Sequence, residues 1–115
     1  MAQERVRGLI VPSEAFYLSQ RQQIGGLALK GRVASIFQYR EHLLAGGLIS
    51  YGPDLGHIYY RVATYVDKIL KGAKPGDLPI EQPTKIHLAI NLKTAKALGL
   101  TVSKELRFRA DELIE

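Results

Sequence analysis

The chain contains no cysteine and no tryptophan, and what it lacks excludes several kinds of site and structure. Without cysteine it can form neither a disulfide framework nor a thiolate metal site, which fits a cytoplasmic and a periplasmic protein equally well. No stretch approaches the ~20 apolar residues of a membrane-spanning helix. The charged start, MAQERVRGLIVPSEAF, carries an apolar stretch too short for the core of a signal peptide.

Motifs of enzymes and metal sites are also missing. The three histidines, His42, His57 and His87, lie far apart and none belongs to an H-E-x-x-H motif, so we expect surface or structural histidines and no metal. Neither QIGGLALKG nor AGGLISYG fits a phosphate-binding glycine pattern. The stretch GLISYG places one residue too many before Ser50 for G-x-S-x-G. The sequence therefore predicts no catalytic set, no enzyme and no cofactor.

Charge gives little support to a nucleic-acid partner. The 115 residues, enough for one domain, include 16 Lys and Arg against 11 Asp and Glu, for a net charge of +5. The basic residues are spread from Arg5 to Arg109 among acidic ones, without a basic run. We therefore expect a solvated basic surface and no nucleic acid.

The apolar pattern predicts alternating strands and helices. Strands are expected at residues 6–11, 33–37, 48–50 and 84–91, and helices at residues 16–31, 39–47, 54–71, 91–99 and 103–114. The β-α-β order implies parallel strands joined by a right-handed crossover. We therefore predict an α/β fold with a short, mostly parallel sheet flanked by helices. Gly25 and Gly26 are expected to pack closely against this sheet, and the half-exposed strand 84–91 to lie near its edge.

Residues 54–71 carry the most regular pattern, with apolar side chains at i, i+3, i+4 and i+7. Asp54 stands where a carboxylate complements the helix dipole. We expect this helix to bury Ile58, Val62, Val66 and Ile69. On that expectation Val62→Asp would unfold the chain, because an unpaired buried charge costs several kcal/mol.

Polar side chains follow three of the expected strands. They are Ser13 and Glu14 after the first strand, Gln38 to Glu41 after the second, and Ser50, Tyr51 and Asp54 after the third. Ligands of parallel α/β sheets bind beyond the carboxyl ends of the strands, so this edge predicts a site for a small polar or aromatic solute. The alternative is that Ser13 and Asp54 are helix caps and that Arg40 and Glu41 form a surface pair.

Four stretches, SYGP, ILKGAKPGDLP, QPTK and INLKTAKALGL, occur in that order along the chain. In these stretches the sequence closely resembles the C-terminal part of ABC-transporter substrate-binding proteins of the tryptophan/tyrosine-type family. The upstream stretch LIVPSEAFYLSQRQQIGGLALKGRVASIFQYRE is similar to the preceding strand-helix-strand unit of that family. The resemblance covers nearly the whole chain but only about the last third of a family member.

The resemblance implies part of a periplasmic-binding-protein type I-like fold, a Rossmann- or flavodoxin-like lobe plus a crossing segment. Residues 1–49 would belong to the second lobe, residues 50–53 to a hinge-like crossing, and residues 54–115 to the first lobe and C-terminal helices. It implies that a small amino-acid-like solute binds between the lobes of an importer component. The ligand-binding candidates are Ser13, Tyr39, Glu41, Ser50, Tyr51 and Asp54.

The resemblance also implies an ABC permease as partner and a periplasmic location, with the secretion signal and most of the first lobe upstream of Met1. A stand-alone product without that signal would be cytoplasmic. The alternative function is a structural remnant that binds no solute and self-associates, as a homo-oligomer, through an exposed apolar helix face. In that case TKIHLAIN would lack sheet neighbours, because these would come from the missing part.

Overall fold

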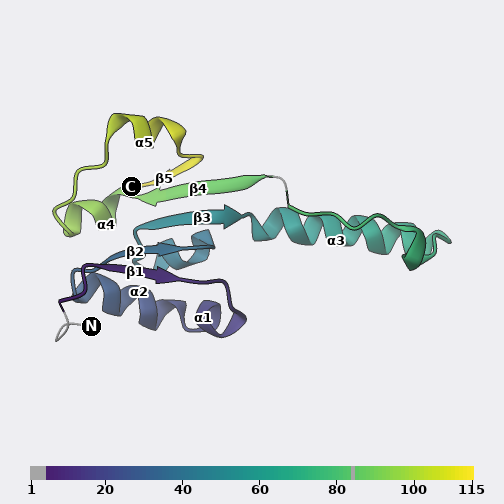
Figure 1. Ribbon diagram of the computed structural model, residues 1–115, viewed down its shortest axis with the longest axis horizontal. Coiled ribbons are helices and arrows are strands. Elements are labelled where there is room, and N and C mark those ends of the chain that lie inside the picture. Colours follow the sequence, from purple (N-terminus) through teal and green to yellow (C-terminus); the bar gives the residue numbers. More distant parts are fainter. Residues whose placement is uncertain (1–4, 84) are drawn as a thin grey trace.

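The computed structural model describes residues 5–83 and 85–115. Its strands are β1 (Gly8–Val11), β2 (Ala34–Phe37), β3 (Ile49–Pro53), β4 (Ile86–Asn91) and β5 (Glu112–Ile114). Its α-helices are α1 (Ala15–Ser19), α2 (Arg21–Lys30), α3 (Leu55–Leu70), α4 (Leu92–Ala97) and α5 (Lys104–Arg109), and two short 3-10 helices are η2 (Arg40–Ala45) and η3 (Pro75–Asp77). The predicted α/β fold is confirmed (Figure 1).

The strands form one sheet in the order β1-β2-β3-β4-β5. The pairs β1–β2, β2–β3 and β4–β5 are parallel and β3–β4 is antiparallel, so the prediction of a mostly parallel sheet is confirmed. The expectation that the strand TKIHLAIN lacks neighbours in this chain is wrong, but it does lie near an edge, because β4 is the fourth of five strands. Its residues 86–91 form β4, which lies between β3 and β5, and Ala89 and Ile90 are fully buried.

One cluster of buried residues lies on the helical face of the sheet. Val11, Phe37 and Ala89 are on this face, and Leu43 of η2 packs against them. Tyr17 of α1 and Ile24 of α2 close the cluster from the helical side. Side chains alternate between the faces of a strand, so the neighbours of these core residues point away from it. Ile10 of β1, on that other face, is 79% exposed.

The helical layer is held together by one close backbone approach. A Cβ on Gly25 would lie 2.5 Å from the Ala45 carbonyl oxygen, so α2 and η2 can touch only because this residue has no side chain. Gly26 has open space around it. The expectation that both glycines pack on the sheet is therefore wrong, because Gly25 packs on η2. Gly46, with φ of 112°, ends η2 as its C-cap.

The C-terminal residues differ from the prediction. Asn91 and Ser103 cap α4 and α5 as expected, accepting hydrogen bonds from the amides of Thr94 and Leu106. However, α5 ends at Arg109, and residues 112–114 form β5 instead of continuing the helix. Asp111 exchanges two 2.8 Å hydrogen bonds with the backbone of Leu88, which aligns the chain along β4.

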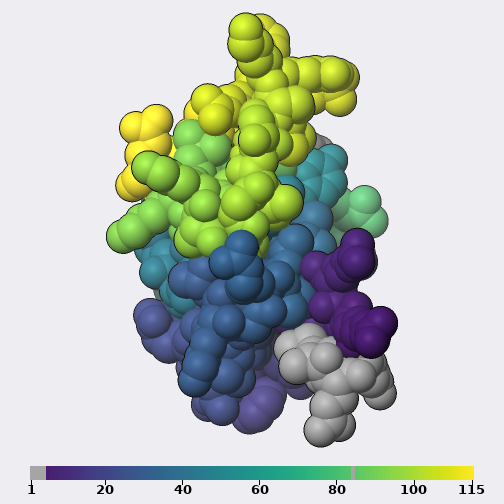
Figure 2. Space-filling model, turned by 90° about the vertical axis from the view of Figure 1, so that its left-hand side faces the viewer, coloured from purple at the N-terminus to yellow at the C-terminus, as the bar shows by residue number. Residues whose placement is uncertain are grey.

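The end of the molecule opposite α3 joins two distant parts of the sequence. Figure 2 shows this end, with the blue residues around α2 and β2 beside the yellow-green residues of α4 and α5. Arg32 donates a 3.5 Å hydrogen bond to the carbonyl of Leu98. The turn after α2 and the end of α4 are therefore in contact on this side of the molecule.

Helix α3 extends away from the sheet and gives the molecule its length of 56 Å, against 31 and 19 Å in the other directions (Figure 1). Residues 71–83 return alongside it: Tyr65 donates a 2.7 Å hydrogen bond to the carbonyl of Pro79, and Arg61 pairs with Glu81. We call residues 54–83 the arm. No described helix is long and apolar enough to cross a membrane.

The expectation that α3 buries its apolar stripe is wrong for this chain. None of the residues of α3 is buried, and Val62 and Val66 are each 49% exposed. Ile69 is exposed and Ile58 is half-buried. The predicted helix itself is confirmed, with Asp54 as its N-cap and Leu70 as its last residue. The stripe stays exposed because the helix begins beyond the end of β3, where this chain offers no second layer.

Candidate functional site

Two of the predicted site residues meet beyond the ends of β1 and β2. The hydroxyl of Ser13 donates a 2.7 Å hydrogen bond to the hydroxyl of Tyr39, and both groups are at the surface or partly so. The alternative that Ser13 is a helix cap does not apply, since Glu14 is the N-cap of α1 and no side chain caps that helix. The structure therefore brings these two hydroxyl groups together at the carboxyl edge of the sheet.

The two candidates on β3 point to opposite faces, as successive residues of a strand do. Ser50 faces the core and is only 1% exposed, whereas Tyr51 is 60% exposed on the other face. Tyr51 lines a hollow of about 250 Å³ together with Ile10, Val11, Pro12, Ile36, Phe37 and Gln38. This hollow is mostly apolar and lies over the carboxyl ends of the three parallel strands.

Glu41, Ser50 and Asp54 line a second, much smaller cavity of about 10 Å³. The other residues around it are Gln38, Arg40, Gly52, Pro53, Leu55 and His87. Gly52 is required here, because a Cβ at this residue would collide with the backbone carbonyl of Gln38. The six predicted residues thus divide into the Ser13–Tyr39 pair, the Tyr51 hollow and this cavity.

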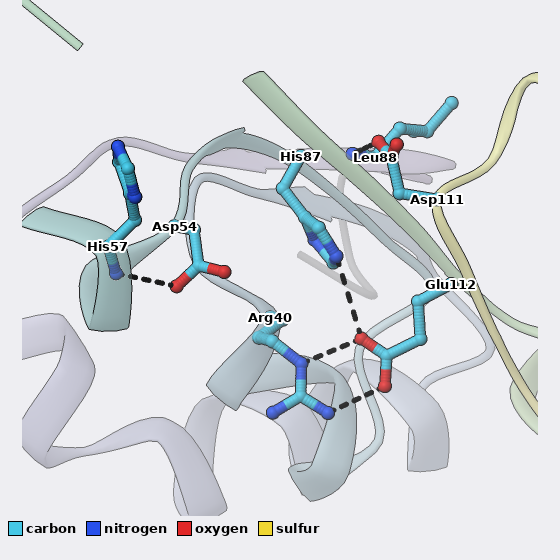
Figure 3. Close-up of polar contacts among 7 residues, drawn as sticks. All are labelled: Arg40, Asp54, His57, His87, Leu88, Asp111 and Glu112. Carbon is cyan, nitrogen blue, oxygen red and sulfur yellow. Dashed lines mark hydrogen bonds and ion pairs between the residues drawn. The ribbon is translucent and has the colours of Figure 1, made fainter. Parts of the chain in front are cut away.

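Sequence reasoning missed a charged cluster beside the cavity (Figure 3). Arg40 donates two hydrogen bonds to Glu112 of β5, at 2.7 Å from Nε and 2.6 Å from Nη2. The imidazole Nε2 of His87 lies 3.9 Å from the same carboxylate. The hydrogen bonds from Arg40 lower the pKa of Glu112 and, in return, raise the pKa of Arg40.

This cluster corrects one expectation and supports another. Arg40 pairs with Glu112, 72 residues away, and not with Glu41, so no local pattern could have revealed the pair. Asp54 caps α3 by accepting a 3.3 Å hydrogen bond from the amide of His57, as the alternative interpretation of that residue states (Figure 3). Arg40 and Asp54 both lie at the base of the arm.

His42 is a structural histidine, as the sequence predicts for the histidines in general. The residue is 3% exposed, and its ring stacks on Phe37 with ring centroids 4.4 Å apart. Burial lowers the pKa of His42, against the smaller opposing effect of the nearby backbone groups of Tyr39 and Tyr17. Neutral imidazole is therefore the form that fits the core.

Comparisons with known proteins agree on the fold. The chain matches a solved protein described as a conserved domain protein from Vibrio cholerae O1 biovar El Tor, with a TM-score of 0.87 and 24% identity over 96% of this chain and 37% of that one. It matches an ABC domain in complex with L-Trp from Streptococcus pneumonia, with a TM-score of 0.88 and 23% identity over 96% and 38%. The ligand-free, open form of CD0873, a substrate-binding protein with adhesive properties from Clostridium difficile, matches with a TM-score of 0.62 and 19% identity over 94% and 36%.

No curated protein matches the sequence. The chain spans a little over a third of the length of each of these solved structures. A family model described as ABC transporter substrate binding protein matches residues 1–114, which is nearly the whole chain. The family predicted from the resemblance is confirmed, and it is a family of solute-binding proteins, not of enzymes. The chain therefore belongs to the ABC transporter substrate-binding protein family.

Proposed function

We propose that this chain is part of the solute-binding component of an ABC importer and that it binds a small amino-acid-like solute in the hollow beside Tyr51. The observation that carries this proposal is the hollow itself. It lies beyond the carboxyl ends of parallel strands, where α/β proteins bind ligands, and it has an apolar lining with an exposed aromatic ring.

The polar groups beside the hollow fit a solute with one apolar and one polar end. Gln38 lines both the hollow and the small polar cavity, so this residue lies between the two. The Ser13–Tyr39 pair supplies hydroxyl groups at the same edge of the sheet. An aromatic amino acid would place its ring against Tyr51 and Ile36 and its polar end toward these groups. One of the solved proteins of similar fold was determined with L-Trp.

We further propose that the arm reaches into the other lobe of a two-lobed clamp. The crossing at residues 50–53 stays a prediction, and our proposal departs from the prediction that all of residues 54–115 belong to the first lobe. Because β4 and β5 pair in the same sheet as β1 to β3, we assign residues 86–114 to the lobe of that sheet and the arm alone to the other lobe. By family, the complete protein would deliver its solute to an ABC permease from the periplasmic side.

Isothermal titration calorimetry tests solute binding. A monomer verified by light scattering is titrated with L-tryptophan, L-tyrosine and L-phenylalanine, and with L-serine and L-lysine for comparison. We expect weak binding of aromatic amino acids only, because a clamp takes contacts from both lobes and this chain covers little more than a third of its relatives. Equal heats for all five, or no heat at millimolar concentration, would refute the proposal.

A matched pair of variants locates the site. Tyr51→Ala removes the exposed ring from the hollow and should abolish the heat of binding. Tyr60→Ala removes a similarly exposed ring from α3 and should leave the heat unchanged. Loss of binding in both variants would place the solute elsewhere.

A second candidate function is self-association without solute. The exposed stripe of α3 favours it, since Tyr59, Val62, Val66 and Leu70 are all exposed and a contiguous apolar patch marks an interface. Size-exclusion chromatography with light scattering at several concentrations tests it. A mass that stays at 12.8 kDa across the series would exclude this function.

A further inference from the structure

A small cavity with a mostly polar lining lies where the arm joins the sheet. Its volume is about 10 Å³, and its lining comes from three parts of the chain. Gln38 follows β2, and Arg40 and Glu41 begin η2. Ser50 and residues 52–55 lead from β3 into the arm, and His87 lies on β4 just after the arm returns. Any rotation of the arm about its base would change the shape of this cavity.

Ser50 is a fully buried polar residue beside the cavity. It is 1% exposed, and its hydroxyl has no hydrogen-bond partner among the described residues. A buried hydroxyl without a partner is unfavourable, so native proteins rarely keep one. Ser35, a buried serine on the same face of the neighbouring strand, accepts a 3.2 Å hydrogen bond from the amide of Leu48.

The size and lining of the cavity select its occupant. A volume of about 10–15 Å³ is what one water molecule needs, and an amino acid is far larger. A buried water also needs two to four polar partners. The lining offers the Ser50 hydroxyl, the carboxylates of Glu41 and Asp54, the Arg40 guanidinium and the His87 imidazole.

We propose that Ser50 holds a single buried water molecule, which bridges β3 to the polar groups of η2 and of the first turn of the arm. The water satisfies the hydroxyl and joins the two sides of the arm's base by hydrogen bonds. Ser50 is then a positioning residue for the arm and does not contact solute. Every measurement below is made without solute, so the outcome is independent of whether the Tyr51 hollow binds an amino acid.

Thermal unfolding of the Ser50→Ala variant tests the proposal, because a bonded and an unpaired hydroxyl predict changes of different sign in the melting temperature. If the hydroxyl bonds to water, its removal loses that bond, and the melting temperature should fall by about 4–8 °C. If the hydroxyl is unpaired, its removal relieves an unsatisfied group, and the melting temperature should stay the same or rise. Ser35→Ala is the matched control, because a fall in its melting temperature shows that the assay detects the loss of one hydrogen bond to a buried serine.

A crystal structure at a resolution that shows ordered water identifies the bridging atom. We expect one water about 2.7–3.0 Å from the Ser50 oxygen. It should be displaced in Ser50→Val, whose two methyl groups occupy the space. A parent structure in which this oxygen bonds directly to a protein atom, or has no water beside it, would overturn the proposal even if Ser50→Ala is destabilised.

The distance between two spin labels, one on α2 and one on the arm, tests whether Ser50 positions the arm. Because the chain has no cysteine, the substitutions Gln22→Cys on α2 and Lys74→Cys after α3 give two unique sites for spin labels. We expect Ser50→Ala to broaden the distribution of distances between the labels and Ser35→Ala to leave it unchanged. An unchanged distribution in Ser50→Ala would show that the water does not fix the arm.

Discussion

The sheet with its helices and the arm follow the same rule of amphipathic patterning with opposite results. In the sheet region, Phe37, Leu43 and Ala89 are buried by other parts of the same chain. In the arm, α3 has the most regular apolar stripe of the sequence and no buried residue. Hydrophobic periodicity thus indicates which face of an element is apolar enough to be buried, but it does not indicate whether the same chain buries that face.

The largest expected effect sharpens this comparison within the core. Phe37 is 2% exposed and stacks on His42, so Phe37→Ala should lower the free energy of unfolding by about 3–5 kcal/mol, measured by urea denaturation. Phe108→Ala on α5 is the control, because that ring is 91% exposed, and its effect should stay within about 0.5 kcal/mol. Equal losses in both variants would show that the core has been placed wrongly.

The next effect tests the packing of α2 on η2. Gly25→Ala forces a methyl group against the Ala45 carbonyl, and we expect it to cost about 1–3 kcal/mol. Gly26→Ala, one residue further along the same helix, meets no atom within 4 Å and should stabilise the helix by up to about 1 kcal/mol. Urea denaturation of the pair gives the sign of each change, and two changes of the same sign would contradict the packing described.

Acid should weaken the sheet region in two stages. Burial lowers the pKa of His42 below 6.5 in the folded chain. Below pH 6.5 the unfolded chain therefore binds a proton at His42 that the folded chain does not bind, and the free energy of unfolding falls as the pH drops. Arg40 lowers the pKa of Glu112 below 4.5, so a second loss begins as the pH drops below 4.5.

Two variants separate these stages. His42→Leu should remove the upper stage and leave the lower one, and Glu112→Gln should do the reverse. Urea midpoints measured from pH 7.5 down to well below pH 4 follow both stages, because the Glu112 stage lies below pH 4.5. A parent midpoint that rises on acidification over this range would contradict the assignment of both groups.

The smallest effect concerns the arm and reverses an expectation from the sequence. The pattern of α3 predicts that Val62→Asp unfolds the chain, but Val62 is half-exposed in the structure. We therefore expect a loss below about 1 kcal/mol in a monomer, mostly from the lower helix propensity of Asp. Thermal unfolding followed by circular dichroism measures it. Complete unfolding would mean that another chain covers the stripe in solution.

The sequence predicted local structure better than long-range contacts. Asp54, Asn91 and Ser103 cap the expected helices because an N-cap needs only a side chain three residues before an amide. By contrast, Leu113 and Ile114 fit a helical stripe in the sequence and yet lie in β5. Pairing with β4, which is distant in sequence, overrides the local pattern there.

The candidate site shows the same limit. The strand ends that carry Ser13, Tyr39 and Tyr51 could be predicted, since parallel strands align their carboxyl ends at one edge. The burial of Ser50 depends on the exact face of a short strand, which a one-residue change of register would reverse. The partner of Arg40 could not be predicted, because Glu112 reaches it only through the pairing of the last strand.

The pairing of β3 with β4 makes the arm an insertion in an otherwise continuous hairpin. The chain leaves the sheet at Pro53 and re-enters it at Ile86, and these two residues are direct register partners. Antiparallel strands whose ends face each other can be joined by a two-residue turn. Residues 54–85 could accordingly be deleted and replaced by Asn-Gly, leaving β1 to β5 as an autonomous miniature sheet, or the arm could be grafted onto another hairpin of the same width.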